Sequence, residues 1–559
     1  MNSLSSHWTS VLRKNSLSLV LSMLLPTLGF DSSAIAAERI YASYSAFERS
    51  ISVNALEQYA TKGVIDDDFA AYTQYLKKEQ LQQLQRALLN PIKVNPVAVS
   101  QFLYTPQGEF LLRRLGEVIK TESRQQKAGL HALRSALILA STEPGGLTLL
   151  NLLRKYPSSS IYIDLSRTLG MAAELEKLVN ETNRAVAAVS QKSNAEAATI
   201  RLPQAFAQLP DLRRKGQFRT QKQTLKFFDS VRKRFLLTDV YLPNVQRRVS
   251  VIVISHGLGS DSSNFEYLAT HLASHGFAVV VPNHPGSDTK QLRSLLGGST
   301  SEIAQADEFK NRPLDVTYIL DQLAERSRTD ARFKGRLNLQ QVGVFGQSFG
   351  GYTALALAGA KINFEQLQKD CQPNKLQDTW NLSLLLQCHA LTLHGNNPRE
   401  YHFRDERIKA VIAVNPITSS IFGEAGLSQI QTPVMIVAGS DDTIAPALYE
   451  QLLPFSWINN SQKYLAVLSG ATHFSIIGNG RGSKQQLALP SEVVGYNPSL
   501  AQRYMNILSV PFFETYVAGM PGYSTYLNAA YAKAISDRSG DLSLVRLITR
   551  TELAQAMKR

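Results

Sequence analysis

A serine stands between two glycines in residues 341–351, which read QVGVFGQSFGG. Gly346 and Gly350 bracket Ser348 in the pattern G-x-S-x-G, with a short apolar run before it and a run of alanines and leucines after it. This context predicts a strand, a sharp turn and a helix, so that the hydroxyl sits at the positive end of the helix dipole. Glycine is required because a Cβ at either flank would collide with backbone in such a turn. The pattern indicates a nucleophilic serine.

Two segments farther along the chain supply the partners that a nucleophilic serine needs. Residues 439–446 read GSDDTIAP, and the spacing G-x-x-D-x-x-x-P favours Asp442 as the acid, with Asp441 as the alternative. Residues 469–474 read SGATHF and contain His473, the expected general base. The order Ser, Asp, His along the chain is that of one class of catalytic triad. The base would take the serine proton and the acid would orient the imidazole, without any metal or cofactor.

Another glycine-rich turn, HGLG at residues 256–259, follows the apolar run VSVIVIS. Its tight path should point the backbone N–H of Leu258 into the site. Together with the N–H of Phe349 it would hold the negative oxygen that forms when a carbonyl is attacked. We expect His256 to form structural hydrogen bonds in this turn and not to act as the base.

These loops must be positioned by a sheet. Apolar runs predict strands at 236–242, 249–255, 278–282, 341–345, 410–414, 434–438 and 464–468, with a helix at 313–326. Runs buried on both faces and separated by helices are typical of a mainly parallel sheet with helices on both sides. In such α/β sheets the reactive groups lie beyond the carboxyl ends of the strands. The predicted fold class is therefore α/β, and the predicted domain covers residues 224–559.

Composition limits the partners and the compartment. The chain has 559 residues, 44% of them hydrophobic, and a formal net charge of +14. Without a nucleic-acid motif or interleaved basic and aromatic residues, we expect no nucleic-acid partner. A soluble basic surface explains the charge. For the basic stretch at residues 211–235, which begins in the linker (201–223), we expect a solvated linker and an edge hairpin, and peripheral contact with an anionic membrane is the alternative.

Residues 1–37 have the layout of a signal peptide: Arg13 and Lys14, then the apolar residues 16–30, then Ala-Ile-Ala at 34–36. An uncleaved anchor is the alternative. Export to the periplasm or the cell exterior would favour a disulfide between the two cysteines, Cys371 and Cys388, over two free thiols. Such a bridge would close an insertion in the α/β domain.

Residues 38–200 carry leucines at helical spacing, which predicts an all-helical N-terminal domain. The pattern contains no cluster of titratable residues arranged like a catalytic site. Its role, whether packing, docking or gating of substrate, stays open.

The four loops HGLGS, GQSFGG, GSDDTIAP and GATHF resemble those of the α/β-hydrolase superfamily, and within it platelet-activating-factor acetylhydrolase-like and dienelactone-hydrolase-like esterases. The N-terminal part resembles an uncharacterised domain that precedes hydrolase domains in exported cyanobacterial proteins. The resemblance implies a serine esterase or lipase acting through Ser348, Asp442 and His473, with no cofactor. Gln347 departs from the histidine or aromatic residue that related lipases often have there, which weakens any inference about substrate preference.

For the substrate we expect an ester of a short or medium acyl chain, such as a lipid or a polyester. Ile417, Ile421, Phe422 and Phe474 are the expected apolar acyl pocket, and the insertion between Cys371 and Cys388 is a candidate lid. Alternatives are a serine peptidase or acyltransferase on the same triad, a binding protein without turnover, and a scaffold whose N-terminal domain is the active part.

Overall fold

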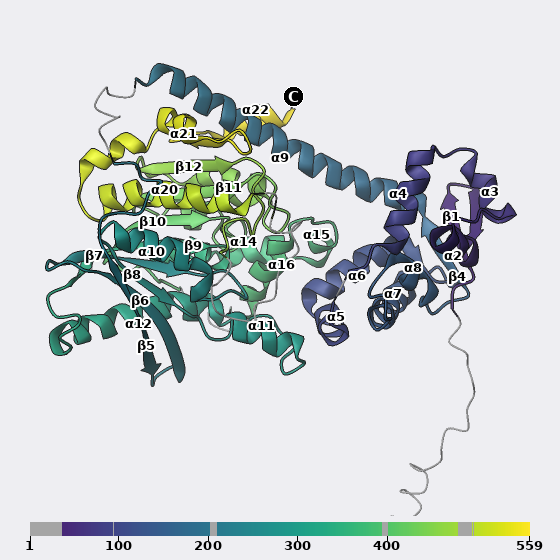
Figure 1. Cartoon of the computed structure of the whole chain (residues 1–559), viewed down its shortest axis with the longest axis horizontal. Coiled ribbons are helices and arrows are strands. Elements are labelled where there is room, and N and C mark those ends of the chain that lie inside the picture. The colour runs from purple at the N-terminus through teal and green to yellow at the C-terminus, as the bar shows by residue number, and fades with distance from the viewer. Residues whose placement is uncertain are drawn as a thin grey trace, which may run out of the picture. The chain divides into compact units, whose positions relative to one another are not determined.

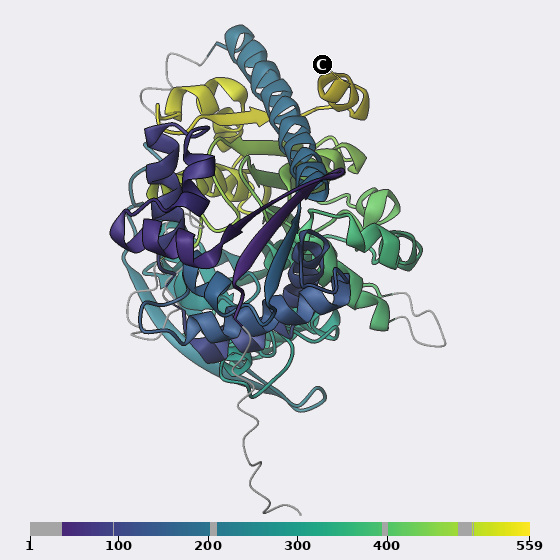
Figure 2. The same cartoon turned by 90° about the vertical axis from the view of Figure 1, so that its right-hand side faces the viewer.

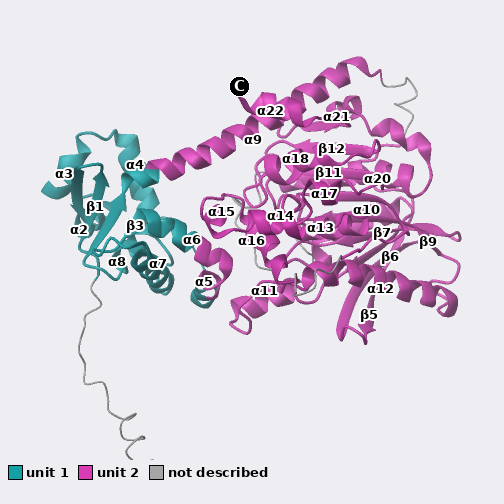
Figure 3. Ribbon diagram, turned by 180° about the vertical axis from the view of Figure 1, so that it is seen from behind, with its two compact units in different colours: residues 1–100, 111–168 teal, residues 101–110, 169–559 magenta. Residues whose placement is uncertain are grey.

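The computed structural model describes residues 36–92, 94–201, 210–393, 401–478, 495 and 497–558. The residues of the predicted signal peptide before Ala36, and most of the linker before Pro210, lie outside the described residues. The chain forms two compact units, one of residues 1–100 and 111–168 and one of residues 101–110 and 169–559 (Figure 3). No helix among the described residues is both long and apolar enough to cross a bilayer.

The first unit contains a β-sheet, so the prediction of an all-helical domain was wrong. Its four strands have the order β2-β1-β4-β3, and β1 and β2 form the hairpin drawn in purple in Figure 2. β1 pairs in parallel with β4, which lies more than a hundred residues later. The strands are β1 (Arg39–Tyr44), β2 (Phe47–Ser52), β3 (Ile119–Lys120) and β4 (Ser160–Asp164).

The helices around this sheet match the leucine periodicity, which is why the sequence read as helical throughout. The signal that was missed is the run of isoleucine and tyrosine in β4, SIYID, because β-branched and aromatic residues favour strands. Tyr162 of β4 stacks on Tyr41 of β1, with ring centroids 4.9 Å apart. The helices are α2 (Val53–Lys62), α3 (Asp67–Thr73), α4 (Lys78–Leu89), α5 (Pro96–Leu103), α6 (Pro106–Val118), α7 (Gln126–Ser141) and α8 (Leu149–Arg154).

The second unit is built on a nine-stranded sheet with the order β13-β12-β11-β10-β9-β7-β8-β6-β5 (Figure 1). The pairs from β8 to β12 are parallel, whereas β5, β6 and β13 pair antiparallel at the two edges. All the predicted strands are present, β5 forms the expected edge hairpin with β6, and β13 is additional. The strands are β5 (Thr220–Asp229), β6 (Arg234–Pro243), β7 (Val249–Ser255), β8 (Ala278–Pro282), β9 (Leu337–Gln347), β10 (Ile408–Val414), β11 (Val434–Gly439), β12 (Lys463–Leu468) and β13 (Leu542–Val545).

Helices cover both faces of this sheet, which gives two hydrophobic cores. Successive residues of β7 belong to opposite cores, Val251 and Val253 to one and Ile252 and Ile254 to the other, because side chains alternate along a strand. Each such side chain, fully buried, contributes about 1.5–3 kcal/mol. The helices are α9 (Leu165–Thr199), η2 (Ser262–Phe265), α10 (Glu266–Ser274), α11 (Thr289–Leu296), α12 (Glu308–Thr329), α13 (Phe349–Leu357), α14 (Phe364–Asp370), α15 (Pro373–Gln377), α16 (Leu382–His389), η3 (Ala390–Leu393), α17 (Gly423–Leu427), the π-helix η4 (Leu448–Leu452), α18 (Leu453–Trp457), α20 (Pro498–Tyr516), η5 (Pro521–Tyr526), α21 (Ala529–Ile535) and α22 (Arg550–Lys558).

The long helix α9 joins this unit through its C-terminal half. Ala185 and Val189 are fully buried in the first core, and the hydroxyl of Ser193 accepts a hydrogen bond from the N–H of Leu544 in the edge strand β13. Lys192 forms an ion pair with Glu552 of α22 at 2.7 Å. The end of α9 thus covers one edge of the sheet, which blocks pairing with another strand there.

A partly buried carboxyl group in α20 makes stability depend on pH. Burial raises the pKa of Glu514 to about 7, and Arg247 opposes this only in part. The folded state therefore holds the proton more tightly than the unfolded chain. The resulting stability is fully present below the ordinary glutamate pKa and is lost as the pH rises through 7.

Glu514→Gln should therefore melt about 3 °C above the wild type at pH 8 and at the same temperature at pH 4, since glutamine never has to ionise. Thermal unfolding of both proteins at the two pH values measures this. An equal difference in melting temperature at both pH values would show that packing, and not ionisation, separates the two proteins.

Candidate active site

Ser348 occupies a strained turn between β9 and α13. Its backbone has φ 55° and ψ −117°, a conformation that side-chain-bearing residues rarely adopt. Its N–H donates to the carbonyl of Val414 at 2.8 Å. A Cβ on Gly346 would lie 1.9 Å from the carbonyl oxygen of Gly350, and one on Gly350 would lie 1.9 Å from that of Ser255. Both glycines of the motif are therefore sterically required.

Three side chains from distant parts of the chain meet at this turn. The Oγ of Ser348 lies 2.8 Å from Nε2 of His473, and Nδ1 of His473 lies 2.6 Å from Oδ2 of Asp442. All three residues are buried. A proton on Nδ1 donates to the carboxylate and leaves Nε2 free to accept the serine proton. His473 follows β12 and Asp442 follows β11, so the carboxyl ends of neighbouring parallel strands bring them together.

The structure distinguishes the two neighbouring aspartates. Oδ1 of Asp442 accepts hydrogen bonds from the N–H groups of Ile444 and Ala445, at 2.9 and 2.8 Å, which leaves Oδ2 facing the imidazole. Asp441 is exposed and accepts a hydrogen bond from its neighbour Ser440. The favoured assignment, Asp442, is the residue that contacts His473.

Two amide side chains hold these loops, and the sequence reasoning did not identify either role. Asn415, at φ 44°, accepts a hydrogen bond from the N–H of Gly439 and donates one to the carbonyl of Thr472. Gln347 donates to the carbonyl of His473 at 3.1 Å. Each residue follows or ends an apolar strand at its carboxyl end, which is the only sequence signal that could have found them.

The backbone N–H groups of Leu258 and Phe349 make no hydrogen bond with any described residue. Phe349 is the first residue of α13, where helical N–H groups lack intrahelical partners. The turn that carries Leu258 is held by His256, whose Nε2 accepts a hydrogen bond from the N–H of His284. Burial, together with the charge of Arg312, holds the pKa of His256 well below its usual value. His256 is therefore a neutral structural residue.

Arg312 of α12 links the two sides of this turn and was not predicted. Its guanidinium is fully buried and donates to the carbonyl of His256 at 2.6 Å and to the hydroxyl of Ser287 at 2.9 Å. It also lies 4.5 Å from the ring centroid of Phe349. Burial lowers the pKa of Arg312 to about 10, so it stays positively charged at neutral pH. A fixed positive charge thus contacts both the turn that carries Leu258 and the ring of Phe349.

Two regions of the chain match known protein-family models. Residues 250–367, which include the serine turn and the turn of Leu258, match the model described as alpha/beta hydrolase fold. Residues 36–164 match the model described as alpha/beta hydrolase of unknown function (DUF1400). Both matched models describe α/β hydrolases, in agreement with the mainly parallel sheet and the serine turn of the second unit. A search of curated proteins finds no match to this chain.

The predicted acyl pocket lies mostly inside the core of the second unit. Ile417, Ile421 and Phe422 are at most 1% exposed, and the ring of Phe422 stacks on that of Tyr352 with centroids 5.1 Å apart. These three residues pack the core and present no open surface. Phe474 is partly exposed and its ring lies 5.1 Å from that of His473, and Leu258 is also partly exposed. Leu258 and Phe474 are thus partly exposed apolar side chains in the loops that carry the site.

The disulfide between Cys371 and Cys388 is present, as predicted. Buried hydrogen bonds also hold this insertion in place. Oε1 of Gln387 accepts from the N–H groups of Ser420 and Ile421, and the buried carboxylate of Glu450, in the π-helix η4, accepts from Gln387. These hydrogen bonds fix the insertion to the loop after β10. A lid that opens freely would lack such contacts.

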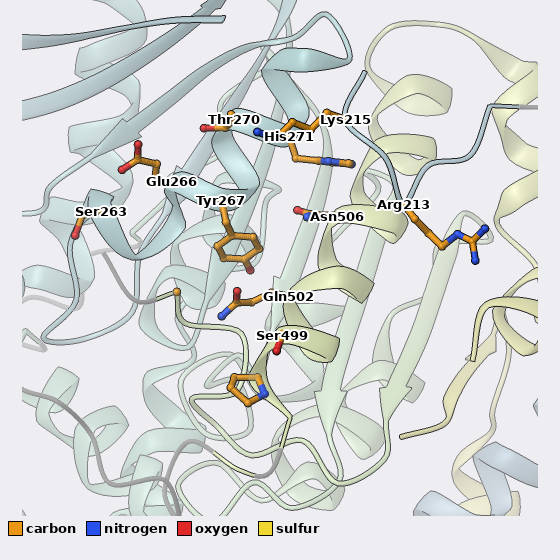
Figure 4. A pocket seen from close by; sticks show the side chains of 12 residues that line it. Arg213, Lys215, Ser263, Glu266, Tyr267, Thr270, His271, Ser499, Gln502 and Asn506 are labelled. Atoms are coloured by element: carbon orange, nitrogen blue, oxygen red, sulfur yellow. The ribbon is translucent and has the colours of Figure 1, made fainter. Parts of the chain in front are cut away.

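A separate hollow of about 720 Å³ lies between α10 and α20, where Figure 4 shows Tyr267, His271, Gln502 and Asn506. None of the residues that line it belongs to the site around Ser348. Within the described ranges, no group of three or more histidine, cysteine, aspartate or glutamate residues is placed to hold a metal ion.

Proposed function

We propose that this protein is a serine hydrolase that cleaves carboxylic esters, of lipids or of other short or medium acyl chains. The observation that carries the proposal is the continuous line of contacts from Ser348 Oγ through His473 to Asp442. The backbone N–H groups of Leu258 and Phe349, which have no hydrogen-bond partner among the described residues, support it. The likeness of the four loops to platelet-activating-factor acetylhydrolase-like esterases supports the ester, as do the partly exposed apolar side chains of Leu258 and Phe474.

In the proposed reaction, Ser348 Oγ attacks the ester carbonyl carbon while Nε2 of His473 takes its proton. The carbonyl oxygen becomes negative and accepts hydrogen bonds from the N–H groups of Leu258 and Phe349. Collapse of this intermediate breaks the ester bond, and His473 gives its proton to the leaving alcohol. A water molecule then repeats the sequence on the acyl-enzyme, which releases the acid and restores the serine.

A fluorophosphonate probe and a set of p-nitrophenyl esters of increasing acyl length test the proposal. The wild type should be labelled and should hydrolyse the esters, and Ser348→Ala should do neither while melting at a similar temperature. An amide with the same acyl group should react far more slowly than the ester. Faster amide cleavage would favour a peptidase, transfer to an added alcohol would favour an acyltransferase, and absence of labelling would favour a binding protein.

We also propose that residues 1–37 direct export to the periplasm or the exterior, and that residues 38–200, 201–223 and 224–559 act as N-terminal domain, linker and hydrolase domain. The disulfide is compatible with an oxidising compartment. N-terminal sequencing of the secreted protein would locate the cleavage site. A protein that keeps Met1 would contradict cleavage and favour an anchor.

A further inference from the structure

The hairpin of β5 and β6 exposes an unusual number of apolar side chains. Val231 in its turn is 90% exposed, and Phe228, Phe235 and Leu237 are 47%, 56% and 47% exposed. Phe228 and Phe235 face each other across the hairpin with ring centroids 4.5 Å apart. Leu225, Phe227 and Leu236 point to the opposite face and are buried in the core, so the outer residues are left without cover.

The strand register places the turn of this hairpin at the edge of the sheet that holds the active site. β6 pairs with β8 up to Thr238 and Pro282, the last residue of β8, and then continues for four more residues to Arg234. The carboxyl end of β8 lies at the same edge as the carboxyl ends of β9, β11 and β12, because these strands are parallel. Figures 1 and 3 show the hairpin projecting beyond the neighbouring strands.

Ion pairs with carboxylates of helix α12 hold the hairpin in place. Arg232 donates to Asp229 and Asp315 at 2.7 Å, and Arg234 donates to Glu308 at 2.7 Å and to Asp315. The positive charges of Arg232 and Arg234 are therefore balanced by carboxylates within the fold. Because these ion pairs already fix the backbone of the hairpin, the hairpin does not have to become ordered when a partner binds. This lowers the entropy cost of binding.

Two lysines beside the apolar side chains keep their charge available. Lys226 and Lys233 are exposed, and neither forms an ion pair with a described carboxylate. The ammonium of Lys226 lies 4.5 Å from the ring centroid of Phe235. Aromatic side chains with adjacent lysines on a projecting turn suit the interface of an anionic bilayer, where the rings enter the headgroup region and the lysines meet the phosphates. A flat apolar face would instead suit a second protein.

We propose that the β5–β6 hairpin, residues 226–237, binds the surface of an anionic phospholipid bilayer and turns the active-site edge toward the lipid. The surface itself is independent of catalysis, and its use in reaching a lipid ester rests on the proposed function. The hairpin would hold the mouth of the site near esters that are sparingly soluble in water.

The direct test places an environment-sensitive fluorophore on the turn of the full chain. Val231→Cys offers one free thiol, because Cys371 and Cys388 are bonded to each other. Leu547→Cys, at a side chain 52% exposed elsewhere, is the matched control. Vesicles of phosphatidylcholine with phosphatidylglycerol should shift the emission of the label at 231 to the blue, and leave the label at 547 unchanged. An equal response at both positions, or none at 231, would overturn the proposal.

Sedimentation with the same vesicles measures affinity. Lys226→Gln with Lys233→Gln should weaken binding about 20-fold at low salt, and Phe228→Ser with Phe235→Ser should weaken it at least tenfold. Binding is measured in the Ser348→Ala background, and hydrolysis of soluble p-nitrophenyl acetate is measured separately in the active enzyme and should not change. Loss of esterase activity alone would contradict only the proposed function. A blue shift that follows protein concentration without vesicles would identify a second copy as the occupant and overturn the lipid proposal.

Discussion

Replacing Asp442 by asparagine is expected to lower kcat for a p-nitrophenyl ester about 10⁴-fold without unfolding the protein. Oδ1 of Asp442 already accepts hydrogen bonds from Ile444 and Ala445, so the asparagine oxygen should take that place. Its amide nitrogen would then face Nδ1 of His473 and donate to it. The ring proton would move to Nε2, and His473 could no longer accept the proton of Ser348.

The neighbouring aspartate is the control. Asp441→Asn changes an exposed carboxylate one residue away and should keep kcat within about twofold, since surface substitutions rarely matter. Steady-state kinetics, the rate of fluorophosphonate labelling and thermal melts measure the three proteins. A large loss of activity in Asp441→Asn with none in Asp442→Asn would reverse the assignment of the acid.

Arg312→Lys is expected to lower kcat about 100-fold and to change KM little. The guanidinium reaches the carbonyl of His256, the hydroxyl of Ser287 and the ring of Phe349 at once, and one ammonium cannot span these groups. The turn that carries Leu258 should then shift, and its N–H should no longer meet the negative oxygen. Loss of one such donor costs about 10²–10³ in kcat. Arg312 is in this sense a positioning residue.

Arg407→Lys serves as the matched control. Arg407 is also largely buried and also binds α12, through Asp321 and the carbonyl of Thr317, but near the start of β10 and away from the active-site edge. Both variants should lose stability to a similar extent, whereas only Arg312→Lys should lose kcat. Equal losses of kcat in the two variants would indicate that Arg312 contributes only to folding.

Local sequence patterns predicted the central sheet well. The runs at β7, β8, β10, β11 and β12 are apolar along their whole length because both faces are covered, and such runs are recognisable without a structure. The sequence patterns did not predict the four-stranded sheet of the first unit. Its strands are short and partly polar, and β1 pairs with a strand more than a hundred residues away. The edge strand β13 was missed for a similar reason.

The sequence by itself determined which residue types could do chemistry: a serine between two glycines, an acid and a histidine in the loops after later strands. These features depend on backbone conformation within a few residues, which neighbouring side chains dictate. Only the tertiary structure decided which aspartate meets His473, that Arg312 and Asn415 hold the loops, that Ile417 and Phe422 are core residues, and that a hairpin stands out at the active-site edge. Those outcomes depend on burial and on contacts between residues far apart in the chain. The spacing of residues along the sequence does not specify such contacts.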